Sequence, residues 1–140
     1  GKRETYPVSS AQKRMYVLQQ LEDGGTGYNM PAVLELEGKL DLTRMDAVFK
    51  KLIKRHESLR TSFTTDTDGD PVQRIHDEVP FRFHTSVLGG QTEQEAASAF
   101  IKPFDLSQAP LFRAGIVKVS DGRHLLLVDM HHIISDGVSV

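Results

Sequence analysis

Apolar side chains at helical spacing predict three helices in this chain. The first covers residues 10–22, and Ser9 with Gln12 three residues later forms a capping-box pattern at its start. The second covers residues 43–58 and the third covers residues 93–101. The second helix has the clearest apolar face, which consists of Met45, Val48, Phe49, Leu52, Ile53 and His56.

Alternating and continuous apolar runs predict extended segments between and after these helices. They cover residues 6–8, 32–37, 60–65, 72–76, 81–87, 111–119 and 124–130. Turn signals at residues 66–70 and at Asp121-Gly122 connect two pairs of neighbouring strands as hairpins. The segment 124–130 is apolar on both faces, so we expect it at the centre of a sheet that is covered on both sides. This order of elements predicts an α/β fold, a sandwich of helices packed against a sheet.

The composition is that of an ordinary globular domain. The chain has 140 residues, enough for one hydrophobic core, and 39% of them are hydrophobic and 26% charged. The net charge of −2, without a basic cluster, gives no reason to expect a nucleic-acid partner, and no apolar stretch approaches the length of a membrane span. The chain has no cysteine, which excludes disulfides and thiolate metal sites and fits a reducing, cytoplasmic compartment.

The strongest chemical signal is the sequence HHIISDG at residues 131–137, directly after the last predicted strand. If that strand extends through His132, the side chains of His131 and His132 point to opposite faces. This separation argues against a shared metal ion and leaves one imidazole for an active-site channel, where histidine is suited to acid–base chemistry. Asp136 can fold back to orient an imidazole or to pair with a basic residue, and Gly137 allows the backbone to turn or to approach another group closely.

Structural roles compete with these chemical interpretations. A single histidine is more often structural than catalytic, and a single acid in a loop more often caps or stabilises a turn. Ser135 and Ser139 lack the Gly-x-Ser-x-Gly frame of a nucleophile elbow, which disfavours a serine triad. The remaining histidines show no metal-ligand spacing, so we expect no metal site and interpret them as structural or exposed: His56, His76, His84 and His124.

Three stretches of the chain form recognisable motifs. Residues 131–137 resemble HHxxxDG, residues 10–18 (SAQKRMYVL) resemble SxAQxRMYxL, and residues 55–63 (RHESLRTSF) match RHExLRTxF at every specified position. Together these motifs resemble those of the condensation domains of nonribosomal peptide synthetases. The motifs occur in the family's order and are spread over nearly the whole chain. The HxxxD core alone is shared with chloramphenicol acetyltransferase and its relatives.

This resemblance implies a fold and a domain boundary. Condensation domains have two chloramphenicol acetyltransferase-like lobes that form a V around a tunnel, and each lobe has a mixed, largely antiparallel sheet packed by helices. Residues 1–140 correspond to a truncated N-terminal lobe, without the C-terminal lobe. We therefore expect the chain alone to be inactive and to self-associate through apolar surface that the missing lobe covers.

The resemblance also implies an enzyme, an acyltransferase of antibiotic biosynthesis within a multienzyme. The acceptor's amine attacks the donor's thioester, and a peptide bond forms. His132 is the implied catalytic residue, either as a base toward the amine or as a group that positions the amine and stabilises the tetrahedral intermediate. His131 and Gly137 are implied as supporting structure, and Asp136 as the partner of an arginine, for which Arg55 is preferred to Arg60.

The implied partners are donor and acceptor peptidyl carrier domains, an adjacent adenylation domain and the missing C-terminal lobe. No cofactor is expected to bind directly, because phosphopantetheine arms of the carrier domains deliver both substrates. Intact His131 and His132 argue against a cyclisation domain. Three alternatives stay open: an epimerisation domain, an ester-forming acyltransferase of the same superfamily, and a non-catalytic lobe that docks carrier domains.

Overall fold

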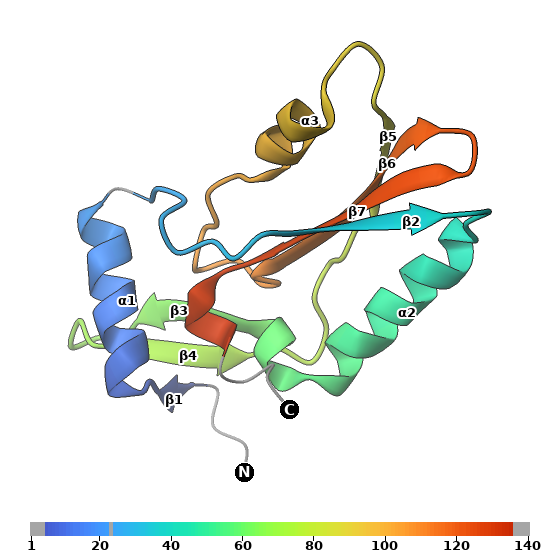
Figure 1. Ribbon diagram of the computed structural model, residues 1–140. Helices are drawn as coiled ribbons and strands as arrows, with labels where there is room; N and C mark the ends of the chain where they lie inside the picture. The colour runs from blue at the N-terminus through green and yellow to red at the C-terminus, as the bar shows by residue number, and fades with distance from the viewer. Residues whose placement is uncertain (1–4, 23, 136–140) are drawn as a thin grey trace.

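The computed structural model describes residues 5–22 and 24–135 of the chain (Figure 1). Three α-helices, two 3₁₀ turns and seven strands alternate within it. In chain order they are β1 Tyr6–Pro7, α1 Ser10–Leu21, β2 Ala32–Glu37, α2 Leu42–Arg55, η1 Glu57–Arg60, β3 Thr61–Thr65, β4 Pro71–Ile75, β5 His84–Val87, α3 Glu93–Phe100, β6 Phe112–Ser120, β7 Arg123–Met130 and η2 His132–Ile134. The expected α/β class is confirmed.

The larger of two sheets has the strand order β2-β7-β6-β5. Strand β7 runs antiparallel to both β2 and β6, and β5 runs parallel to β6. Gly122 has a φ of +76°, a conformation that glycine adopts without strain, in the turn between β6 and β7. The central position predicted for residues 124–130 is therefore confirmed, as is the hairpin at Asp121-Gly122.

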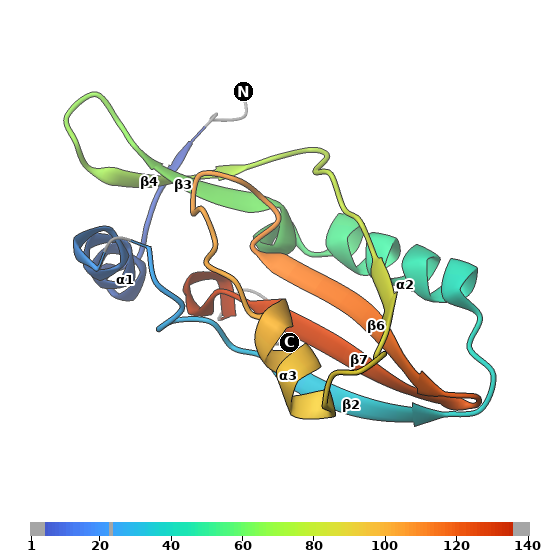
Figure 2. The same cartoon turned by 90° about the horizontal axis from the view of Figure 1, so that it is seen from above.

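Helices cover both faces of this sheet (Figures 1 and 2). On one face, α2 packs Phe49 and Ile53 against a core that includes Phe112 and Ala114 of β6. On the other face, α3 packs against β6 and β7 in a smaller core of Ala96, Val117, Leu125 and Leu127. Strand β7 carries apolar residues on both faces because both are buried, as its sequence indicated.

Helix α2 is shorter than its sequence pattern predicted. Asp41 caps its first turn by accepting a hydrogen bond from the Arg44 backbone N–H at 3.0 Å, and His56 ends it with an extended backbone. Residues 57–60 form the separate turn η1, so the predicted end near residue 58 is wrong. The predicted apolar face is only partly covered, since Val48 is 49% exposed and Leu52 is 38% exposed.

The expected strand 81–87 is also shorter in the structure. Only His84–Val87 pairs with β6, and the preceding residues have no strand structure. The rings of Phe81 and Phe83 instead lie 6.2 and 5.5 Å from the Phe49 ring. Aromatic packing onto α2 therefore replaces sheet pairing in this segment.

A second, three-stranded sheet has the order β1-β4-β3, which the sequence did not indicate as a separate layer. Strands β3 and β4 form a hairpin, and the predicted turn at residues 66–70 connects them. In this turn the Asp66 N–H donates to the Asp70 carbonyl at 2.8 Å. Helix α1 lies beside this sheet (Figure 1), and its Ser9–Gln12 capping box is present as expected.

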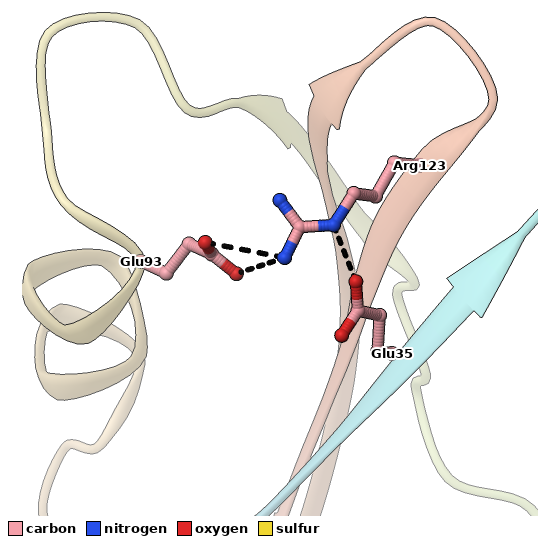
Figure 3. A network of polar contacts seen from close by, with 3 residues as sticks. All are labelled: Glu35, Glu93 and Arg123. Atoms are coloured by element: carbon pink, nitrogen blue, oxygen red, sulfur yellow. Dashed lines mark hydrogen bonds and ion pairs between the residues drawn. The ribbon is translucent and has the colours of Figure 1, made fainter.

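Arg123 of β7 connects two strands of the larger sheet with helix α3 (Figure 3). Its guanidinium donates to Glu35 of β2 and, at 3.1 and 3.3 Å, to both carboxylate oxygens of Glu93 in α3. All three side chains are partly exposed, so these ion pairs contribute little to the stability of the fold. Within the described part of the chain, no helix has the length and apolar character needed to cross a membrane.

Candidate functional site

The predicted site follows the central strand β7, where the chain turns sharply. Strand β7 ends at Met130, His131 forms an isolated bridge with Asn29, and His132–Ile134 forms the turn η2. His131 is fully buried, whereas His132 is exposed. The two imidazoles therefore have separate environments, as expected, although the turn rather than a continuous strand separates them.

Hydrogen bonds fix both ring nitrogens of His131. Its Nδ1 accepts from the Ile133 backbone N–H at 3.0 Å, and its Nε2 lies 3.1 Å from Oε1 of Gln19. Because Nδ1 accepts, the ring hydrogen is on Nε2 and is donated to Gln19. Burial, with a smaller contribution from the charge of His132, lowers the pKa of His131 from 6.5 to about 4. His131 is therefore a neutral, structural imidazole at physiological pH.

The exposed His132 is held by its backbone rather than by its ring. Its N–H donates to the Tyr28 carbonyl at 2.8 Å, and its carbonyl accepts from the Ser135 hydroxyl at 2.8 Å. The Ser135 oxygen also lies 3.4 Å from Nδ1 of His132. Since the Ser135 hydrogen is used on the carbonyl, this oxygen can only accept from Nδ1–H. That arrangement leaves the lone pair of His132 on Nε2, where it can accept a proton or a hydrogen bond.

A cavity of about 370 Å³ lies beside the turn and brings residues of all three motifs together. Gln12 of α1, Arg55 at the end of α2 and Ile134 of η2 are among its lining residues, whereas His132 is not. The Gln12 side chain also donates to the Ile133 carbonyl at 3.2 Å. The first motif therefore caps its own helix and holds the histidine turn 121 residues later in the chain.

The two candidate arginines differ in their contacts. The Arg60 guanidinium donates to the backbone carbonyls of Ile53, Lys54 and His76, so it satisfies the end of α2. Among the described residues, none forms a hydrogen bond or ion pair with the Arg55 side chain, which lines the cavity. Asp136 and Gly137 lie outside the described residues.

Sequence reasoning missed the polar residues that support the turn. Gln19 is 3% exposed, and it lies on the same helical face as Gln12 and Met15. The position of Gln19, a polar residue on the buried face of an amphipathic helix, was the sequence signal that could have indicated a supporting role. Asp129 is also buried. Burial raises the pKa of its carboxyl group, while a hydrogen bond from Asn29 and the charge of Arg113 act in the opposite direction. Among the described residues, no three histidine or acidic side chains cluster to hold a metal ion.

Comparisons with known proteins agree on one family. The sequence model described as "Condensation domain" matches residues 2–140. The chain is 84% identical over 139 residues to one of the plipastatin synthase subunits of Bacillus subtilis (strain 168), a match that covers 99% of this chain and 5% of that protein. It is 55% identical over 140 residues to bacitracin synthase 2 of Bacillus licheniformis, a match that covers 100% of this chain and 5% of that protein.

Solved structures confirm the fold of the lobe. The starter condensation domain of rhizomide synthetase superposes with a TM-score of 0.80 and 27% identity over 98% of this chain and 38% of that chain. The chain spans 4–5% of the length of the plipastatin synthase subunits and about a third of the solved condensation domains. The activities of these relatives as whole proteins therefore depend on many residues outside the segment that matches this chain.

The neutral state of His131 predicts that stability depends on pH. Between pH 4 and 6.5 the unfolded chain binds a proton on this residue that the folded chain does not, so the free energy of unfolding rises with pH in this window. Urea unfolding of the wild type and His131→Asn should give a stability difference that shrinks by up to about 3 kcal/mol from pH 7 to pH 4. His132→Asn, at the exposed neighbour, is the matched control. A His131→Asn difference that is constant with pH would contradict the assignment.

Proposed function

The chain belongs to the condensation domain family, and on this basis we propose that its parent protein forms peptide bonds in nonribosomal peptide synthesis. The acceptor's amine nitrogen attacks the donor's thioester carbonyl, the new C–N bond replaces the C–S bond, and the released thiolate takes up the proton lost by the amine. The observation that carries the proposal is the exposed His132, whose Nε2 has no partner among the described residues, next to a neutral and buried His131.

Two roles of His132 fit this geometry. As a base, Nε2 takes a proton from the attacking amine; as a positioning group, it accepts a hydrogen bond from the amine and supports the tetrahedral intermediate. An α-amine has an unperturbed pKa of about 7.7–8.0, so a useful fraction is already unprotonated near neutral pH. A strong base is not needed for the first proton, and the proposal therefore includes either role.

The remaining parts of the proposal concern the assembly. The chain is the N-terminal lobe of a condensation domain, and the C-terminal lobe supplies the other wall of the tunnel. Donor and acceptor carrier domains deliver substrates on phosphopantetheine arms, beside an adenylation domain, in a cytoplasmic multienzyme. Side chains that are exposed here support burial by the other lobe, or self-association of the chain alone: Val33, Leu34, Val48 and Leu52.

Asp136 is proposed to pair with Arg55. Arg60 already donates to three backbone carbonyls, and moving it would leave the end of α2 without these partners. Arg55 lines the same cavity as Ile134, two residues before Asp136. An ion pair between them would fix the loop after η2, and the family resemblance makes Gly137 a backbone position beside the channel.

Replacing His132 tests the proposed activity. In the full-length parent, His132→Ala should reduce product formation by roughly 10²- to 10⁴-fold, because it removes the group that handles the amine proton. Product is measured with both carrier domains loaded, and circular dichroism checks that the exposed position tolerates the change. The 140-residue chain alone should yield no product above background. Unchanged product formation by His132→Ala would instead favour a docking role.

A double-mutant cycle tests the proposed ion pair. In the full-length parent, Arg55→Ala and Asp136→Ala should each lower activity, and the double variant should be little worse than either, with a coupling energy of about 0.5–3 kcal/mol. Arg60→Ala should mainly lower the melting temperature, since it uncaps α2. Additive effects of Arg55 and Asp136, or coupling of Asp136 to Arg60, would refute this pairing.

A further inference from the structure

Gln19 has a position unlike that of the other polar residues of α1. It is 3% exposed, and both ends of its amide are engaged: Nε2 donates to the Gly25 carbonyl at 3.2 Å, and Oε1 faces Nε2 of His131 at 3.1 Å. The neighbouring Gln20 is exposed. A buried side chain that contacts both the loop before β2 and the buried histidine is placed to influence the turn that presents His132.

We propose that Gln19 is a positioning residue for the reaction at His132, acting through His131 and through the loop that contains Gly25 and Tyr28. The inference rests on the proposed function of His132. Gln19 does not touch the exposed imidazole, and its effect is confined to where and how rigidly that imidazole is held.

The first route runs through the His131 ring. The Gly25 carbonyl can only accept, so the NH₂ end of the Gln19 amide faces it and the oxygen faces His131. An oxygen at that place requires a hydrogen on Nε2 of His131, which leaves the Nδ1 lone pair for the Ile133 N–H. The orientation of one amide therefore selects the tautomer that closes η2 behind His132.

The second route runs through the loop. Gln19 anchors this loop at Gly25, and the Tyr28 carbonyl further along accepts the His132 backbone N–H at 2.8 Å. The Tyr28 ring also lies 6.0 Å from the His131 ring. Both routes reach the backbone around His132. The first acts through the turn η2, and the second acts through the Tyr28 carbonyl, which accepts the His132 N–H.

A glutamine suits this position better than a carboxylate. Protonated His131 would carry a hydrogen on Nδ1, facing the Ile133 N–H, and the bond that closes the turn would be lost. A carboxylate at residue 19 would stabilise that protonated form, whereas the neutral amide accepts from Nε2–H without doing so.

Among residues 5–22 and 24–135, few ionisable groups act on the His131 ring. His132 on its own turn is the charged group that contributes to its lowered pKa, and Tyr28 is the titratable neighbour from the loop. Helix α1 contributes the uncharged Gln19, and the segment before β6 contributes the Phe104 ring at 6.3 Å. A new carboxylate at residue 19 should therefore dominate the titration of His131.

The test compares Gln19→Leu and Gln19→Glu with the exposed control Gln20→Leu in the full-length parent. Gln19→Leu should lower kcat on the order of 10- to 100-fold, with little change in KM for the carrier-bound acceptor, because the imidazole is misplaced rather than removed. Gln19→Glu should keep most of its activity at high pH and lose it as the pH falls, because His131 becomes protonated. This loss should occur at a higher pH than in the wild type. Gln20→Leu should match the wild type.

The outcomes separate this inference from the proposed function. If His132→Ala abolishes product but both Gln19 variants behave like Gln20→Leu, or lose activity equally at every pH, the positioning role is refuted. A second readout does not depend on catalysis: ring ¹⁵N resonances of His132 in the labelled 140-residue chain should shift in Gln19→Leu and not in Gln20→Leu. Unshifted His132 resonances in Gln19→Leu would overturn the inference, even if the parent proves to have another activity.

Discussion

The buried, neutral imidazole of His131 is the interaction on which the site depends. It accepts a hydrogen bond from the Ile133 N–H on one nitrogen and donates to Gln19 through the other, so it connects η2 to the neighbouring helix α1. The same α1 supplies Gln12, which holds the Ile133 carbonyl. Two side chains of one helix thus fix the turn that follows the central strand, and the turn directs His132 outward.

This arrangement divides the work between two adjacent, chemically identical side chains. Burial disfavours a charge on His131, which suits a structural hydrogen-bonding role, whereas exposure leaves His132 accessible to a substrate. The rigid sheet matters equally, because β7 is paired on both edges and covered on both faces just before the turn. A residue that directly follows such a strand has a firmly held backbone, while its side chain can still be exposed to a substrate.

Much of the fold followed from periodicity and turn signals, because strands such as Ala32–Glu37 and hairpins such as β6–β7 depend on local sequence. The predictions that failed involve tertiary contacts: Phe81 and Phe83 pack on α2 instead of pairing with β6, and η1 replaces the last turn of the predicted second helix. The family and the separation of His131 from His132 were also predictable from the motifs. The burial of Gln19 could have been predicted from its place on the helical face, but its contact with His131 could not, since no local pattern indicates a partner 112 residues away.

The most direct test of this account is the tautomeric state of the two histidines. Long-range ¹H–¹⁵N spectra of the imidazole rings, recorded near pH 7, distinguish a hydrogen on Nε2 from one on Nδ1. We predict that His131 is neutral with its hydrogen on Nε2 and stays so down to about pH 4, while neutral His132 carries its hydrogen on Nδ1. A charged His131 at neutral pH, or one with its hydrogen on Nδ1, would contradict it.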